Sequence, residues 1–147
     1  MSRWLLVLAL WAGLAACGGR DRGALLRDSV RGFNQSLRWG AFDAASRYVE
    51  AEKRADWLQA RVSGSSNLRM TDVQIVRVDQ GALEAKPGEK PTQEARALVS
   101  MSWYRLPDMT VHSAVWRQTW HLRHDDWVLV NEEAVQDAPA ATAPSWP

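Results

Sequence analysis

Apolar residues in the first half of the chain recur at helical spacing. Between Arg22 and Arg38 they return every three or four residues, as on one face of an amphipathic helix, and Gly40 then breaks the run. Two further segments repeat this spacing before a Gly- and Ser-containing loop at residues 64–67. The helical positions are Leu25, Leu26, Val30, Phe33 and Leu37, then Phe42, Ala45, Tyr48 and Val49, then Ala55, Leu58, Ala60 and Val62. This half is therefore predicted to form helices.

From residue 68 the apolar spacing changes to two, which is typical of half-buried strands. The inward-facing sets are Val73 and Ile75; Ala95, Ala97, Val99, Met101 and Trp103; Ala114, Trp116, Gln118, Trp120 and Leu122; and a last strand over residues 127–130. Gly81 suggests a hairpin near the end of the first strand, residues 86–91 form a solvated loop, and residues 124–126 form a turn. Helices followed by an antiparallel meander predict an α+β domain with the helices on one side of the sheet.

Two stretches of the chain resemble the NTF2-like superfamily. Residues 37–48 resemble its short helix after a Gly-Asp-like step, and residues 120–130 resemble its terminal hairpin with a polar turn and a Trp. The resemblance spans residues 24–133 and implies N-terminal helices packed on a curved antiparallel sheet. A cystatin-like arrangement is the alternative. NTF2-like members include isomerases, hydrolases and binding domains, so the resemblance does not determine the function.

The first residues carry the pattern of an export signal. A positive charge at Arg3 precedes an uncharged apolar run over residues 4–14, which is too short to cross a bilayer permanently. The run leads into Leu14-Ala15-Ala16-Cys17, which resembles the bacterial lipobox, in which the cysteine thiol carries diacylglycerol. The alternatives are an ordinary signal peptide with an incidental cysteine, and a buried free cysteine.

The lipobox resemblance implies a domain organisation and a location. The predicted parts are a signal peptide at residues 1–16, the lipidated Cys17 with a spacer to residue 23, the α+β domain at residues 24–135 and a disordered Pro- and Ala-rich tail at residues 136–147. The acyl chains on Cys17 would hold the protein durably to a membrane. Because Gly18 rather than Asp follows Cys17, the resemblance implies the periplasmic face of the outer membrane in a Gram-negative host.

The cysteine count and the charge balance exclude some structural and functional classes. Cys17 is the single cysteine, so an intramolecular disulfide is excluded and the domain depends on packing. Without Arg3 the chain carries 17 basic and 17 acidic residues, a balance that leaves no electrostatic footprint for nucleic acid. Seven of the nine tryptophans lie beyond the signal, and burial of each can contribute up to about 5 kcal/mol.

Few residues carry candidate catalytic chemistry. An enzyme would need acid and base groups that converge in a pocket, and the candidates are Tyr48, Asp72, Tyr104 and His121. Strand alternation places Asp72, Tyr104 and His121 toward solvent, and the helical spacing places Tyr48 on an apolar face. No catalytic motif is present, so we expect no catalytic residues.

A local His and Asp cluster occurs at His121, His124, Asp125 and Asp126. The spacing of its two histidines across a strand and turn does not aim both imidazoles at one metal ion. We therefore expect neither a metal site nor a cofactor.

Gln118 is a polar residue on an otherwise aromatic strand face, between Trp116 and Trp120. It either lines a cavity and binds a ligand, or lies near an edge and reaches water. In the first alternative, the pocket is lined by Tyr48, Trp103, Trp116, Gln118 and Trp120.

These patterns together predict a membrane-anchored envelope lipoprotein that acts as a non-catalytic binding module. The expected partners are the membrane through the lipid on Cys17, an envelope protein or a small apolar ligand, and a second copy through the sheet, but no nucleic acid. The alternatives are an NTF2-like enzyme of isomerase or hydrolase type and a purely structural envelope component.

Overall fold

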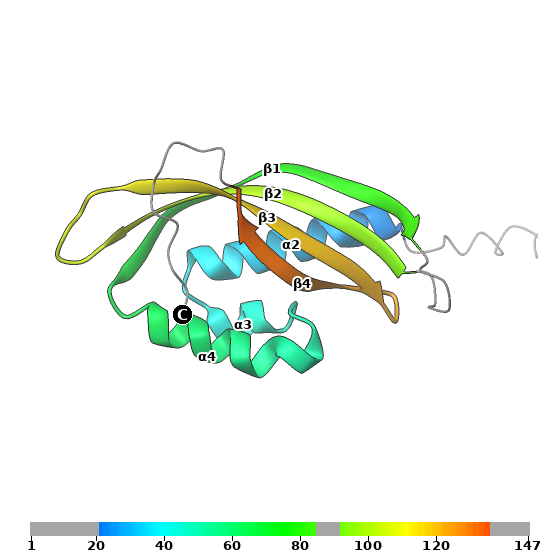
Figure 1. Cartoon of the computed structure of the whole chain (residues 1–147), viewed down its shortest axis with the longest axis horizontal. Coiled ribbons are helices and arrows are strands. Elements are labelled where there is room, and N and C mark those ends of the chain that lie inside the picture. Colours follow the sequence, from blue (N-terminus) through cyan, green and yellow to red (C-terminus); the bar gives the residue numbers. More distant parts are fainter. Residues whose placement is uncertain (1–20, 85–91, 136–147) are drawn as a thin grey trace, which may run out of the picture.

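The computed structural model describes residues 21–84 and 92–135, and shows a layer of helices against one face of a four-stranded sheet (Figure 1). The elements are α2 (Arg22–Arg38), α3 (Phe42–Ser46), the 3₁₀ helix η2 (Ala51–Lys53), α4 (Arg54–Gly64), β1 (Leu68–Glu84), β2 (Thr92–Arg105), β3 (His112–Arg123) and β4 (Asp126–Ala134). The predicted fold class, α+β with N-terminal helices packed on a curved antiparallel sheet, is confirmed.

Several predicted features lie outside the described residues. These are the signal peptide at residues 1–16, Cys17 with the first half of its spacer at residues 18–20, the loop at residues 86–91 and the tail at residues 136–147. Within the described ranges, no helix is both long and apolar enough to cross a membrane.

Helix α2 covers the segment that the apolar spacing predicts. The carboxylate of Asp21 caps its start by accepting a hydrogen bond of 2.9 Å from the backbone N–H of Gly23. The buried residues of the helix are Leu26, Val30, Phe33, Asn34 and Leu37. At the other end, Trp39 caps the helix and Gly40, with φ of +66°, turns the chain toward α3.

Helix α4 forms where a further helix was predicted, but its buried face differs from the apolar one in the sequence. Val62 is 55% exposed, whereas the neighbouring Arg61 is buried. Of the apolar positions predicted in this helix, Leu58 and Ala60 are half-buried, whereas Ala55 and Val62 are exposed. The helix is held instead by the charged side chain of Arg61, which forms an ion pair with Glu132 on β4.

The strands pair antiparallel in chain order, with β1 and β4 at the two edges. In β2 and β3, every second residue is buried, and the register sets Val99 opposite Trp116 and Ala97 opposite Gln118. A two-residue turn joins β3 to β4, and both of its residues, His124 and Asp125, have positive φ.

Strand β1 continues past Gly81 to Glu84, so the predicted hairpin position at Gly81 is wrong. The pairing with β2 shifts between Gln80 and Leu83, which places Gly81 in a bulge. A Cβ atom on Gly81 would lie 2.9 Å from the carbonyl oxygen of Glu94. Glycine therefore permits the close approach of the β2 backbone at this point.

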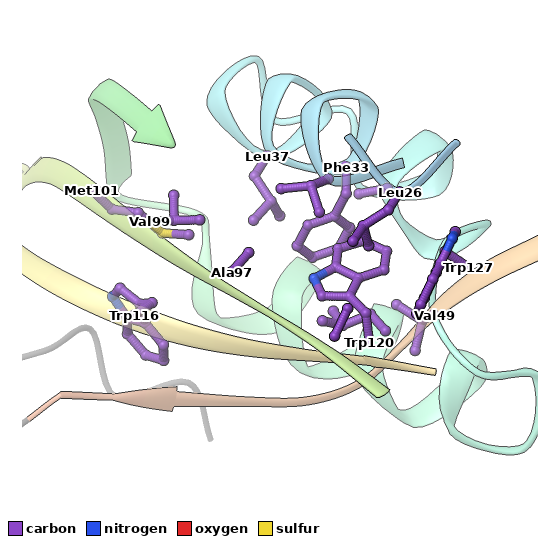
Figure 2. Close-up of a cluster of buried hydrophobic side chains, with 14 of the residues drawn as sticks. Leu26, Phe33, Leu37, Val49, Ala97, Val99, Met101, Trp116, Trp120 and Trp127 are labelled. Atoms are coloured by element: carbon purple, nitrogen blue, oxygen red, sulfur yellow. The ribbon is translucent and has the colours of Figure 1, made fainter. Parts of the chain in front are cut away.

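The core lies between α2 and the facing side of the sheet (Figure 2). Phe33 meets Trp120 edge to face, with ring centroids 5.7 Å apart and an interplanar angle of 85°. Trp127 is also buried, and its indole N–H donates a hydrogen bond of 2.9 Å to the carbonyl oxygen of Arg22. This bond ties the start of α2 to β4.

Candidate functional site

A buried amide pair connects α2 to β3. Gln118 is 0% exposed, and its Nε2 donates to Oδ1 of Asn34 at 2.9 Å, while Nδ2 of Asn34 donates to Oε1 of Gln118 at 3.0 Å. Nδ2 of Asn34 also donates to the carbonyl oxygen of Val30 at 2.8 Å. The alternative in which Gln118 reaches water is therefore wrong.

The carboxylate of Glu132 extends this pair into a polar network of Asn34, Arg61, Gln118 and Glu132. Gln118 Nε2 donates to Glu132 Oε1 at 3.3 Å, and Trp57 Nε1 donates to Glu132 Oε2 at 3.2 Å. The Arg61 guanidinium forms an ion pair with the same carboxylate oxygen and lies 5.0 Å above the Trp57 ring. The network thus joins α2, α4, β3 and β4.

A bulge in β4 turns Glu132 toward the helices. Trp127 and Leu129 are buried, but the β3–β4 pairing then shifts between Thr119 and Trp120, which leaves Val130 unpaired. The extra residue reverses the alternation of β4. Glu132 therefore faces inward, whereas Asn131 and Glu133 are exposed.

Burial decides the electrostatics of the network. Removal from water lowers the pKa of Arg61, and the charge and hydrogen bond of Glu132 oppose that effect. An arginine guanidinium nevertheless stays protonated in proteins. Both side chains are less than a tenth exposed, so loss of one partner leaves the other as an uncompensated buried charge.

The hydrogen bonds of the network hold helix α4 in place against the sheet. Oε1 of Glu132 accepts from Gln118, and Oε2 accepts from Arg61 and Trp57. Both oxygens of this carboxylate are therefore engaged by side chains of the protein itself. Its effect is to fix α4 against the sheet.

The predicted pocket tryptophans lie in the core. Trp103, Trp116 and Trp120 are buried, and Trp103 stacks on His112 with ring centroids 6.0 Å apart. In the part of the chain that the structure describes, the indole N–H groups of Trp116 and Trp120 have no hydrogen-bond partner. That these side chains line a ligand pocket stays a prediction.

Tyr48, the fifth predicted residue, borders a hollow of about 480 Å³. The hollow is also lined by Glu50, Arg54, Arg123 and His124. Glu50 lies 3.5 Å from both the Lys53 ammonium and the Arg123 guanidinium, so its carboxylate is already paired.

Asp72, Tyr104 and His121 lie apart from the polar network. The Asp72 carboxylate is 3.8 Å from the Arg38 guanidinium, and His121 lies 3.5 Å from Glu94. Tyr104 is half-buried on β2. Over residues 21–84 and 92–135, no three His, Cys, Asp or Glu side chains are grouped as a metal site requires.

A second hollow, of about 350 Å³, lies where α2 ends beside the start of β1. It is lined by Leu37, Arg38, Trp39, Gly40, Phe42, Ser65, Leu68, Arg69 and Met70. Trp39 is 78% exposed, which is unusual for the largest apolar side chain.

Comparisons with known proteins identify the fold. No protein-family model and no curated protein sequence matches the chain. Among solved structures, an NTF-2-like protein of unknown function from Shewanella oneidensis is similar, with a TM-score of 0.53 at 14% identity over 76% of this chain and 97% of that one. The fold is NTF2-like.

Two other solved structures are similar to the chain over most of their length. A putative Ca/calmodulin-dependent kinase II association domain from Exiguobacterium sibiricum gives a TM-score of 0.61 at 10% identity, over 83% of this chain and 98% of that one. The beta subunit of benzoate 1,2-dioxygenase from Burkholderia mallei gives 0.50 at 13% identity, over 75% and 87%. These similarities favour the NTF2-like arrangement over the cystatin-like alternative and show the fold alone.

Asn34, Arg61 and Glu132 were not among the residues predicted for a site. Asn34 could have been found, because it lies four residues after Val30 and three before Leu37 on the apolar stripe of α2. Arg61 and Glu132 carry no such signal, because each stands where a surface charge is expected.

Proposed function

We propose that this chain is a lipid-anchored lipoprotein of the cell envelope whose NTF2-like domain binds a partner protein or an apolar ligand without catalysis. The anchoring is supported by the apolar run over residues 4–14 that leads into Leu14-Ala15-Ala16-Cys17. The proposed location is the periplasmic face of the outer membrane, on the basis of Gly18.

The non-catalytic role is supported chiefly by the hydrogen bonds that the Glu132 carboxylate accepts. The Glu132 side chain points from β4 toward the helices, and a general base must have a carboxylate oxygen within hydrogen-bond reach of its substrate. Here three donors from Trp57, Arg61 and Gln118 occupy the Glu132 carboxylate. The interior therefore acts as a rigid support for a binding surface.

The anchoring is tested by labelling cells that express the full chain with a palmitate analogue. Wild-type protein should carry the label and fractionate with the outer membrane, whereas Cys17→Ser should lose both properties. Gly18→Asp is the matched control, because it keeps the cysteine and should keep the label while the protein moves to the inner membrane. An unlabelled wild-type chain, or a membrane-bound Cys17→Ser chain, would refute the proposal.

The binding role is tested by photo-crosslinking in intact cells. A photoreactive residue is placed at several exposed positions of the full chain, including Met109 on the β2–β3 connection. A discrete crosslinked envelope protein at some positions and not others supports the module. A single product at twice the mass of this chain would instead indicate the homodimer through the sheet.

A further inference from the structure

The hollow beside Trp39 combines an exposed aromatic side chain with an apolar floor. Leu68 and Leu37 are buried beneath it, and Phe42 and Met70 are partly buried against the core. The exposed Trp39 indole borders this floor instead of filling it. Exposed aromatic groups beside a preformed apolar hollow are typical of protein-binding sites.

The charged residues that line this hollow are both arginines. Arg38 and Arg69 line it, and Arg31 and Arg38 line an adjoining hollow of about 200 Å³ against β1. The guanidinium of Arg38 lies 5.6 Å from the Trp39 ring centroid. Arg69 donates to the carbonyl oxygens of Ser66 and Leu68, and over the described residues it makes no ion pair.

The partly satisfied charges favour an acidic partner. The contact of Arg38 with Asp72 is 3.8 Å long, and both side chains are 43% exposed, so water screens it. A carboxylate brought in by a partner could pair with Arg38 or Arg69 in a bidentate geometry. An apolar side chain beside that carboxylate could occupy the floor next to Trp39.

We propose that the Trp39 surface, formed by Arg38, Trp39, Phe42, Arg69 and Met70, binds a segment of a partner protein that carries an apolar anchor flanked by carboxylates. This inference rests on the proposed binding function and names its surface and partner chemistry. The aromatic and arginine side chains of this surface supply most of the binding free energy. The carboxylates of the partner orient it and raise the association rate constant.

The test uses the full chain in neutral detergent and a fluorescein-labelled peptide, Asp-Glu-Phe-Asp-Leu-Glu, with binding followed by fluorescence anisotropy. The peptide should bind, and binding should weaken as salt is raised. Trp39→Ala and Arg69→Glu should each raise Kd by about tenfold or more. Arg77→Glu is the matched control, because Arg77 is an exposed arginine of the same strand that lies outside both hollows, and it should leave Kd within about twofold.

Other outcomes would overturn the inference. These are failure of the peptide to bind, an equal loss in Arg77→Glu and Arg69→Glu, and equal binding of a peptide with Ser in place of Phe and Leu. A dimer that Trp39→Ala converts to monomer in light scattering would show that a second copy covers the surface. Peptide binding that appears only after deletion of residues 136–147 would assign it to the chain's own tail. None of these results affects the labelling of Cys17 or crosslinks from other surfaces, so the proposed function is judged separately.

Discussion

Asn34 on α2 and Gln118 on β3, 84 residues apart in sequence, exchange two amide hydrogen bonds of 3.0 and 2.9 Å in the interior. A reciprocal amide pair has one satisfactory orientation, so it fixes the position of α2 along β3 more narrowly than apolar contacts alone. Glu132 then carries the same constraint to α4 through Arg61.

Replacement of one member of the amide pair should destabilise the domain. Asn34→Leu leaves Oε1 of Gln118 without its donor and Nε2 without one acceptor, at a cost of about 1–3 kcal/mol. The double variant Asn34→Leu with Gln118→Leu should lose less than the sum of the two single variants in urea denaturation. Additive losses would show that the two amides are not coupled.

Loss of the buried arginine should cost more than loss of an exposed one. Arg61→Met leaves Glu132 buried and unpaired, and should lower the free energy of unfolding by about 3–5 kcal/mol. The matched control is Arg117→Met, since Arg117 pairs with Glu133 at 2.7 Å with both side chains about half exposed. It should cost no more than about 1 kcal/mol. Similar losses in the two variants would contradict the role of burial.

Gly32 on α2 should not tolerate alanine. A helix-interior Gly→Ala change normally stabilises by about 1 kcal/mol, but here the added Cβ would lie 2.2 Å from the Tyr48 hydroxyl oxygen. Gly32→Ala should therefore destabilise by about 1–3 kcal/mol, measured by thermal denaturation.

Two variants check that the Tyr48 hydroxyl is the cause. Tyr48→Phe in the Gly32→Ala background should recover part of the loss, because it removes the nearest atom. Gly23→Ala, whose nearest contact is 3.3 Å away in the flexible Asp21 side chain, should be neutral or stabilising. A stabilised Gly32→Ala would mean that Tyr48 moves aside freely.

The pKa of Asp108 should depend on Thr110. The Thr110 hydroxyl, at 2.7 Å, and its backbone N–H, at 3.0 Å, hold the pKa of the Asp108 carboxyl below its usual range. Because the pKa of Asp108 is lower in the folded state than in the unfolded state, these hydrogen bonds stabilise the folded state above the ordinary pKa of about 3.9. This stabilisation is lost as the pH falls through the lowered pKa. Thr110→Val should raise the pKa in an NMR titration, and Thr71→Val should not.

Much of the fold could be predicted because, along α2, β2 and β3, the buried residues recur at the spacing of the apolar residues in the sequence. The residues at Leu26, Val30, Phe33 and Leu37 are all buried as the helical spacing predicts. The alternating residues of β2 and β3 likewise meet on the helical side of the sheet. In these elements most of the inward-facing side chains are apolar, so their spacing marks the buried face.

The polar network could not be predicted, because its parts depend on tertiary structure. Glu132 faces inward only because an unpaired Val130 reverses the alternation of β4, and no residue type marks that bulge. Arg61 is buried only because Glu132 lies opposite, 71 residues away in sequence. Apolar spacing in α4 pointed to Val62 instead, which lies one residue from the true contact.

Helix α2 also sets a distance between its two ends. Its 17 residues measure about 25 Å, with its first turn tied to β4 through Trp127 and its last residue beside Trp39. Under the proposed lipidation, the acyl chains attach before the first turn. The length of the helix would then separate the Trp39 surface at its far end from the end that is nearest the lipid in sequence.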